Sequence, residues 1–274
     1  MEAAHAQMSS GAFGRIATVA KAEAGLLLPE VKLEMVQSRL ARRLRALRLP
    51  SFEAYCDLVE ADAGRDERRE LINALTTNVT RFMREPHHFE EFAAQIAPQL
   101  ADDARRGRRV RVWSAGCSSG EEPYSIAITA LLASEDTISG DFKILATDID
   151  DRVLAAARAG TYPLDAVTAA FGANTQKYFD QSVNDAVVRP DIRKMIAFKH
   201  LNLMSKWPMS GPFQAIFCRN TLIYFDGPTQ NRMIEGFSKL LQAGGALFLG
   251  HSERVDADLE TKFERSGLTS YRRK

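Results

Sequence analysis

From about residue 107 onward, apolar strand-like segments alternate with helix-like segments, and this alternation restricts the fold more than any other feature. The predicted strands are Arg109–Ser114, Phe142–Thr147, Gln214–Cys218 and Gly245–Gly250. The predicted helices between them are Glu121–Ala133, Asp151–Ala159 and Pro228–Leu241. Strands that alternate with helices run mostly parallel, and the helices cover both faces of the sheet. The sequence therefore predicts an α/β fold for this part of the chain.

The chain before this point has a different pattern, typical of helices alone. The first predicted helix begins after Ser9–Ser10 and ends at Gly25, the second spans Pro29 to Arg48, and the third begins at Ser51. The fourth spans Arg68 to Leu75, and the fifth runs from Pro86 to about Gln99. We expect a helical domain at 1–84, a linker with a helix at 85–106 and the sheet domain at 107–274. Residues 160–201 interrupt the alternation, and we interpret them as an inserted β-subdomain that includes Met195–Lys199.

Composition excludes several classes of protein. The 274 residues carry 36 Lys and Arg against 35 Asp and Glu, so a globally basic, nucleic-acid-type charge is absent. The cysteines, Cys56, Cys117 and Cys218, are too widely spaced for a zinc site or a disulfide framework. The chain has neither a secretory leader nor a membrane-spanning apolar run, which favours a cytoplasmic protein without membrane insertion.

The ends of the first two predicted strands point to an adenosine-containing cofactor. The first strand ends in Ala115-Gly116, and Gly120 opens the next helix, so we expect the backbone to approach a bound adenosyl group closely. Asp148 ends the second strand, where a carboxylate can accept hydrogen bonds from both ribose hydroxyls. The alternative is that Asp148 or Asp150 caps the following helix.

The glycine loop also indicates which cofactor. Its sequence, Gly116-Cys117-Ser118-Ser119-Gly120, lacks the middle glycine of a dinucleotide-binding loop, and the chain contains no phosphate-binding GxxxxGK[ST] motif. S-adenosylmethionine has no phosphates to bind and tolerates this simpler loop. We therefore predict S-adenosylmethionine as cofactor and S-adenosylhomocysteine as its product.

Four segments together resemble one family. They are LTTNVTRFMREPHHF (75–89), VWSAGCSSGEEPYSIA (112–127), IFCRNTLIYFD (216–226) and GHSERV (250–255). This combination is similar to the chemotaxis-receptor methyltransferases, the CheR-type protein-glutamate O-methyltransferases. The resemblance implies a small helical domain followed by a Rossmann-like S-adenosylmethionine-dependent methyltransferase domain that carries a small β-subdomain.

The resemblance also implies a set of site residues. Arg84 would pair with the methionine carboxylate, Glu122 (or its neighbour Glu121) would face the ammonium group, and Asp148 would hold the ribose. Arg219 would line the methionine end, and either Arg219 or an arginine of the helical domain would orient the substrate carboxylate. The remaining cofactor contacts implied are Asn78, Thr80, Gly116, Asn202, Leu203 and Asn220.

We predict no metal site, although His87 and His88 are adjacent. Side chains of neighbouring residues on a helix point about 100° apart, and the sequence suggests no second pair of ligands nearby. We expect Cys117 to be a small packing residue rather than a nucleophile.

The predicted reaction needs no general base. The pKa of a glutamate carboxyl group is about 4.3, so the group is ionised at pH 7, and the enzyme has to align the reactants and exclude water. Two alternatives remain: a non-catalytic module that senses S-adenosylmethionine, and a methyltransferase acting on nucleic acid or amide nitrogen. Against the latter, Arg219-Asn220-Thr221-Leu222 replaces the Asn/Asp-Pro-Pro-Tyr/Phe signature of amide and adenine N-methylases.

The predicted second helix carries a local positive charge. Six Lys and Arg stand against Glu34 between residues 31 and 50, while Leu33, Val36, Leu40, Leu44 and Leu47 form its apolar stripe. We expect Arg39, Arg42, Arg43 and Arg45 to dock the cytoplasmic signalling region of chemoreceptors. Nucleic acid is disfavoured as a partner, and we expect a monomer. Asn184 to Lys199 contains no glycine, which predicts independence from a receptor C-terminal pentapeptide tether.

Overall fold

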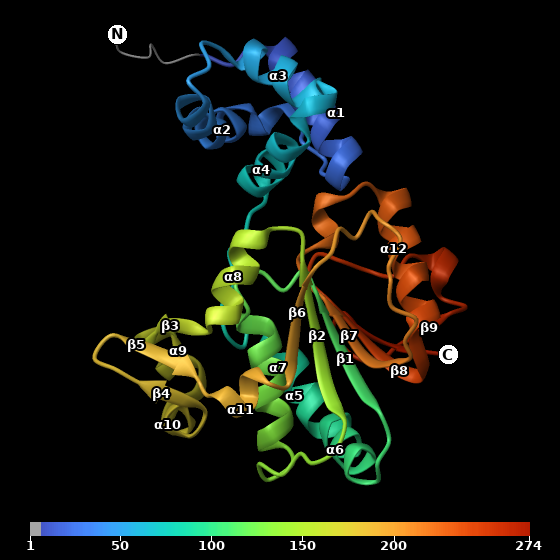
Figure 1. The fold of residues 1–274 in the computed structure, drawn as a ribbon. Helices are drawn as coiled ribbons and strands as arrows, with labels where there is room; N and C mark the ends of the chain where they lie inside the picture. Colours follow the sequence, from blue (N-terminus) through green and yellow to red (C-terminus); the bar gives the residue numbers. More distant parts are fainter. Residues whose placement is uncertain (1–6) are drawn as a thin grey trace. The chain divides into compact units, whose positions relative to one another are not determined.

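A computed structural model describes residues 7–274, which divide into two compact units. The first contains the described residues up to Thr77 together with 224–229. The second contains 78–223 and 230–274 (Figure 1). Segment 78–84, expected in the helical domain, therefore lies in the second unit.

The first unit is helical, as predicted. Its helices are α1 (Ser10–Ala24), α2 (Leu33–Leu47), α3 (Phe52–Glu60) and α4 (Arg65–Leu75), with 3-10 turns at Glu30–Lys32 and Asp62–Gly64. The Ser9 side chain accepts a hydrogen bond from the amide of Ala12 and caps α1, and Gly25 ends α1 with a φ of 69°. Ser51 caps α3 in the same way.

The second predicted helix is shorter than expected. Glu30–Lys32 form a 3-10 turn, so α2 begins at Leu33 rather than near Pro29. Val36 and Leu40 are buried as predicted, but Leu47 is exposed because it stands at the last turn of α2. The inward stripe is therefore one turn shorter than the pattern indicated.

The second unit is built on a mostly parallel sheet. Within residues 78–274 this is a seven-stranded sheet in the order β6-β2-β1-β7-β8-β10-β9. The strands are β1 (Val110–Ala115), β2 (Phe142–Asp148), β6 (Ile196–His200), β7 (Phe213–Cys218), β8 (Leu241–Leu249), β9 (Phe263–Arg265) and β10 (Ser270–Arg273). Strands β6, β2, β1, β7 and β8 are parallel, and β10 pairs antiparallel with both β8 and β9. Strands β9 and β10 are too short for a periodic pattern to reveal them.

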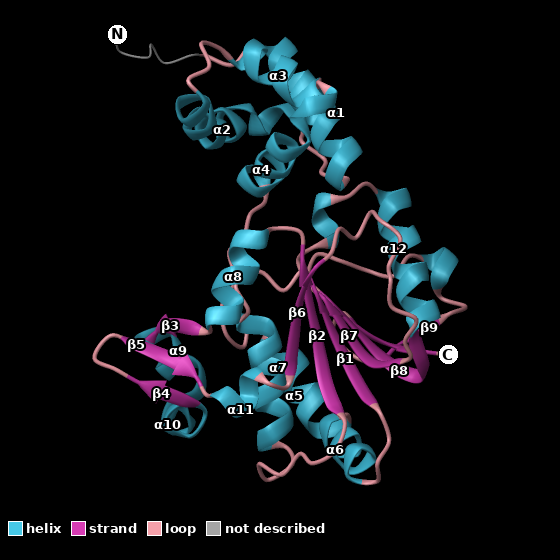
Figure 2. Ribbon diagram, in the orientation of Figure 1, coloured by secondary structure: helices cyan, strands magenta, loops and turns pink. Residues whose placement is uncertain are grey.

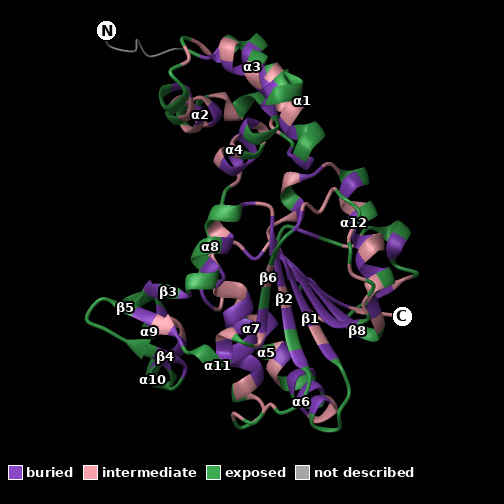
Figure 3. Cartoon of the chain, in the orientation of Figure 1, coloured by how far each residue is buried: buried purple, intermediate pink, exposed green. Residues whose placement is uncertain are grey.

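Helices cover both faces of this sheet, which confirms the predicted fold class (Figure 2). They are α5 (Pro86–Gln95), α6 (Ala97–Arg105), α7 (Glu121–Leu132), α8 (Asp151–Ala159) and α12 (Gly227–Leu240). Val112 of β1 belongs to the core that α5, α6 and α7 share, while the next residue, Trp113, packs against Phe237 of α12. The central strands β1 and β7 are accordingly mostly buried (Figure 3).

The predicted helix from Pro86 to Gln99 is two helices. The backbone of Ile96 leaves the helical region with a φ of −125°, and α6 begins at Ala97. Pro98 lies in the first turn of α6, where its missing N–H has no helical partner to lose. Pro98 thus belongs to the first turn of a second helix.

The inserted segment forms a small antiparallel sheet, in the order β3-β5-β4 (Figure 2). Its elements are β3 (Thr161–Pro163), α9 (Leu164–Phe171), α10 (Thr175–Tyr178), β4 (Phe179–Gln181), β5 (Asp185–Val188) and α11 (Pro190–Arg193), with a 3-10 turn at Gly172–Asn174. The assignment of Met195–Lys199 to this subdomain is wrong. Ile196 pairs with Ile144 of β2, so β6 extends the large parallel sheet. Periodicity alone cannot tell which sheet a short strand joins.

No helix in residues 7–274 combines the length and the apolar character needed to cross a membrane.

Candidate functional site

The parallel strands bring the predicted site residues to one edge of the sheet. Because β1, β2, β6 and β7 are parallel, their carboxyl ends lie at the same edge. Gly116 follows β1, Asp148 ends β2, Asn202 follows β6 and Arg219 follows β7. Asp148 and Leu201 are joined directly, because the backbone oxygen of Asp148 accepts a 2.9 Å hydrogen bond from the amide of Leu201. These four predicted cofactor residues therefore share one edge.

Asp148 and Asp150 have different roles, which resolves the capping alternative. The Oδ1 of Asp150 accepts from the amide of Arg152 and caps α8, and its Oδ2 accepts from Nδ2 of Asn78 at 2.9 Å. Asp148 is 9% exposed, and its two oxygens accept from the amides of Ser118 (2.8 Å) and Asp150 (3.0 Å). Burial raises the pKa of Asp148 above its usual range. Its carboxylate is thus fixed at the end of β2 without serving as a helix cap.

The two glycines of the first loop are required by the protein's own packing. Gly116 has a φ of 84°, and a Cβ there would lie 2.2 Å from Oγ1 of Thr221. Gly120 has a φ of 100°, and a Cβ there would lie 2.8 Å from the Cβ of Ala157. The structure accounts for both glycines by backbone conformation and close packing.

Glu122, rather than Glu121, reaches the ends of the central strands. Its Oε1 accepts from Oγ of Ser114 on β1 at 2.7 Å, and its Oε2 lies 3.2 Å from Nη1 of Arg219. Burial raises the pKa of Glu122, and the positive charge of Arg219 opposes that shift. Glu121 instead accepts a hydrogen bond from Ser119 within its own loop.

Arg219 is almost completely buried between two carboxylates. Its side chain is 2% exposed and lies 3.2 Å from Glu122 and 3.6 Å from Oε2 of Glu85. It also donates to the backbone oxygen of Arg84 and lies 5.3 Å from the centre of the Phe89 ring. Because these groups surround the guanidinium, its contacts favour a role in organising the site over direct binding of a substrate carboxylate.

Segment 78–84 supplies three further predicted residues. The backbone oxygen of Asn78 accepts a 2.9 Å hydrogen bond from Oγ of Ser118 in the glycine loop. Nη1 of Arg84 donates to the backbone oxygen of Val79 at 2.9 Å, and Thr80 lies half-buried between them. Within residues 7–274 no ion pair joins Arg84 to Glu85 or Glu90, so the structure does not favour a surface ion pair as the role of Arg84.

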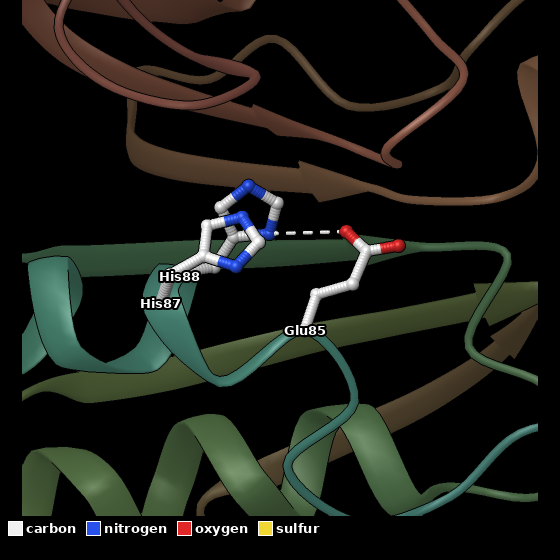
Figure 4. A group of neighbouring side chains, drawn as sticks. All are labelled: Glu85, His87 and His88. Carbon is white, nitrogen blue, oxygen red and sulfur yellow. Dashed lines mark ion pairs between the residues drawn. The ribbon is translucent and has the colours of Figure 1, made fainter.

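Glu85, His87 and His88 form a cluster that the sequence analysis missed (Figure 4). Their potential ligand atoms lie within 4.8 Å of one another, so Glu85 adds one candidate ligand beside the two histidines. The helix begins at Pro86, which places Glu85 just before the two histidines. Nε2 of buried His88 lies 3.0 Å from the backbone oxygen of Leu268, and burial lowers the pKa of His88 to about 4.

Charge argues against a cation in this cluster. The guanidinium of Arg219 lies 3.6 Å from Oε2 of Glu85, one of the two carboxylate oxygens that the cluster offers. Burial raises the pKa of Glu85, but Arg219 and a hydrogen bond from His251 outweigh burial and hold it below its usual range. The arginine already supplies positive charge there, so the expectation of no metal now depends on Arg219 and stays a prediction.

A cavity of 280 Å³ opens beside Leu203 and contains residues that the sequence analysis did not select. Oδ1 of Asn202 accepts from the amide of Met204, and the indole nitrogen of Trp207 donates to the backbone oxygen of Leu203. The cavity is also lined by Met204, Trp207, Met209, Arg232, Met233 and Lys239. Trp207 sits in a segment without periodic pattern, so no sequence signal indicated it.

The expected basic face of α2 is only partly available. Nη1 of Arg39 donates to the backbone oxygens of Leu75 (2.7 Å) and Thr76 (3.0 Å), and Arg43 pairs with Glu67 at 2.5 Å. Placing Arg39 and Arg43 on an exposed face is therefore wrong, because both side chains reach over to α4 or its end. Arg42 and Arg45 are exposed, as expected.

Two family models together match nearly the whole chain. Residues 78–272 match the CheR methyltransferase, SAM binding domain, and residues 11–76 match the CheR methyltransferase, all-alpha domain. The chain belongs to the CheR methyltransferase family. The family resemblance and the two-part organisation expected from the sequence are thereby confirmed.

Named relatives agree with this membership. The chain is 46% identical over 254 residues to a probable chemotaxis protein methyltransferase of Rhizobium etli, covering 91% of this chain and 95% of that protein. It is 42% identical over 270 residues to the chemotaxis protein methyltransferase of Escherichia coli, covering 96% and 91%. A Salmonella typhimurium chemotaxis protein methyltransferase matches at the same 42% over 96% of this chain and 90% of its own. The CheR protein described here is accordingly a methyltransferase with an S-adenosylmethionine-binding domain.

Proposed function

We propose that this CheR protein transfers the methyl group of S-adenosylmethionine to glutamate side chains in the cytoplasmic signalling region of chemoreceptors. The products are glutamate methyl esters and S-adenosylhomocysteine, and the reaction adjusts receptor signalling during adaptation. The observation that carries the proposal is the joint position of Asp148 and the Glu122–Arg219 pair at the carboxyl edge of a matched SAM-binding domain. Its relatives named as chemotaxis protein methyltransferases support the choice of substrate.

The residues at this edge suit the proposed cofactor. Each oxygen of Asp148 accepts one backbone amide and keeps a further lone pair for a ribose hydroxyl. Glu122 offers a carboxylate for the ammonium group, and Arg84 offers its remaining guanidinium nitrogens for the methionine carboxylate. Asn202 and Leu203 would flank the adenine beside the cavity, and Asn78, Thr80, Gly116 and Asn220 would complete the site.

The protein's part in the reaction is to hold two reactants in line. Bound S-adenosylmethionine supplies an electrophilic methyl group on a sulfonium. The acceptor glutamate is ionised at neutral pH, since its ordinary pKa is about 4.3, so no side chain has to remove a proton. The fixed Glu122–Arg219–Glu85 arrangement keeps the methionine end in one place, and alignment of this kind contributes much of the rate of such displacements. We propose that no metal takes part.

We place receptor docking on the exposed arginines Arg42 and Arg45 of α2. Receptor segments that bear several glutamates are acidic, and complementary charge speeds encounter and sets register. We further propose that the protein is a cytoplasmic monomer, and that it methylates receptors without a C-terminal pentapeptide tether.

A labelling experiment tests the proposed reaction. Purified protein, S-adenosylmethionine with a radioactive methyl group and a receptor cytoplasmic fragment should give labelled receptor that releases methanol in base. The Asp148→Ala variant should give little label, and the exposed Asp258→Asn variant should match wild type. Base-stable label would indicate an N-methyltransferase, and absence of label with intact cofactor binding would indicate a sensing module.

A further inference from the structure

Glu253 is a buried carboxylate outside the predicted site, in the loop that follows β8. Its side chain is 2% exposed. Oε2 accepts from the amides of Gly250 (2.6 Å) and Asn220 (2.9 Å), and Oε1 accepts from the amide of Ile223 (3.2 Å). Asn220 and Ile223 belong to the loop after β7, so this carboxylate connects the loops that follow two neighbouring parallel strands.

The surroundings of Glu253 indicate that its carboxylate serves to accept these backbone hydrogen bonds. Within residues 7–274 no lysine, arginine or histidine forms an ion pair with it, so backbone N–H groups alone compensate its burial. Burial raises the pKa of Glu253, and the hydrogen bonds from Gly250, Asn220 and Ile223 oppose the shift. Hydrogen bonds to an ionised acceptor are about twice as strong as neutral ones.

The loops that Glu253 connects approach each other unusually closely. A Cβ at Gly250 would lie 2.6 Å from the amide nitrogen of Asn220 and 2.8 Å from Oε2 of Glu253. Asn220 itself has a φ of 56°, a left-handed conformation that asparagine tolerates better than most residues. Such a conformation persists where surrounding contacts fix it, and the Glu253–Asn220 hydrogen bond is one of them.

Fixing Asn220 also fixes its neighbour Arg219. The guanidinium of Arg219 contacts Glu122 and Glu85, and Nδ2 of Asn220 donates to Oε1 of Glu85 at 3.3 Å. A shift of the loop after β7 would therefore displace the pair that faces the methionine end of the proposed cofactor.

We propose that Glu253 is a positioning residue for methyl transfer, which holds Arg219 and Asn220 in register by binding the backbone of the loop after β7. The inference rests on the proposed function, since it assigns these two residues to the cofactor site. Glu253 itself acts through them and contacts no reactant.

The test uses Glu253→Gln, which keeps the shape of the side chain but replaces one acceptor oxygen with a donor amide. Affinity for S-adenosylhomocysteine is measured by calorimetry, well below the unfolding temperature of each variant. Loss of a charge-assisted hydrogen bond lowers an equilibrium constant about tenfold or more, and we expect a loss of that order for Glu253→Gln. Glu253→Ala should lose more, and the exposed Asp258→Asn in the same segment should lose nothing.

A double-variant cycle separates positioning from general stability. If Glu253 acts through the Arg219–Glu122 pair, then Glu253→Gln should cost less affinity in a Glu122→Gln background than in wild type. Should Glu253→Gln fail to fold, Gly250→Ala replaces it, because the added methyl group presses on the same contacts while the carboxylate remains.

Two results would overturn the inference. One is a folded Glu253→Gln or Gly250→Ala variant that melts at a lower temperature but binds S-adenosylhomocysteine with wild-type affinity. The other is a fully additive cycle with Glu122→Gln. Failure of the proposed function looks different, because the wild-type protein would then fail to bind S-adenosylhomocysteine or to methylate receptor.

Discussion

Arginines on α2 and at the carboxyl edge of the sheet look alike in the sequence but differ in environment. Arg219 is 2% exposed and lies between the carboxylates of Glu85 and Glu122. Arg42 and Arg45 extend from the surface of the helical unit. A buried charged side chain is held in place by its partners and keeps the site in one conformation, whereas an exposed one remains available to bind another molecule. The difference indicates which arginines support structure and which can bind a partner.

Removal of Arg219 should give the largest effect. Arg219→Ala leaves the carboxylates of Glu85 and Glu122, which are only 12% and 11% exposed, without their shared cation. Breaking a buried pair costs about 3–5 kcal/mol in the free energy of unfolding. Urea denaturation measures the loss, with Arg42→Ala as the exposed control, for which we expect a change within about 0.5 kcal/mol. Equal stability of the two variants would remove the contrast between the regions.

Asp148→Ala should lower the affinity for the cofactor product. Under the proposed ribose assignment it removes a charge-assisted hydrogen bond worth about 1.5–3 kcal/mol, or roughly ten- to 150-fold in affinity for S-adenosylhomocysteine. Calorimetric titration provides the measurement, and Asp165→Asn, at an exposed position, is the control. Unchanged affinity in a folded Asp148→Ala protein would rule out the ribose assignment.

Arg43→Ala tests the division within α2 itself. Glu67 is 9% exposed. In this variant it would keep the hydrogen bond from the hydroxyl of Tyr55 but lose both hydrogen bonds from Arg43. We expect a loss of about 1–3 kcal/mol in the free energy of unfolding, because a buried acceptor is left without part of its partners. Chemical denaturation measures this loss, with Arg45→Ala as a control for which we expect no change in the free energy of unfolding. Equal values for the two variants would show that these two arginines do not differ.

Charge reversal at Arg42 and Arg45 should leave the stability of the protein unchanged and slow the methylation of receptor. We expect Arg42→Glu with Arg45→Glu to lower the rate of receptor methylation while affinity for S-adenosylhomocysteine stays at the wild-type value. The wild-type rate should also fall with added salt, since the Debye length shrinks from about 10 Å at 0.1 M to about 3 Å at 1 M. A wild-type rate in the double variant would place receptor docking elsewhere.

The smallest expected effect concerns the receptor's C-terminus. A receptor lacking its last five residues should be methylated at an undiminished rate. In the small β3-β5-β4 sheet, β3 and β4 are the edge strands to which an extended peptide would add. Initial rates on full-length and truncated receptor provide the comparison, and a large drop with the truncated receptor would establish a tether.

Local sequence signals determined the elements and the edge at which the site lies. Periodic apolar residues identified β1, β2, β7, α7 and α8, and Ser9 with Gly25 defined the ends of α1 because capping is a short-range interaction. Asp148 could be selected because the carboxyl ends of parallel strands meet at one edge. The family motifs then supplied roles that the spacing of residues could not.

Tertiary structure alone decided which distant groups form hydrogen bonds or ion pairs. Glu253 and Asn220 are 33 residues apart, and Arg219 and Glu122 are 97 apart, so no local pattern connects them. Whether Arg39 is exposed depends on the end of α4, and whether β6 joins the large or the small sheet depends on β2. Periodicity reports how one segment is buried, whereas pairing depends on which distant segment the fold brings beside it.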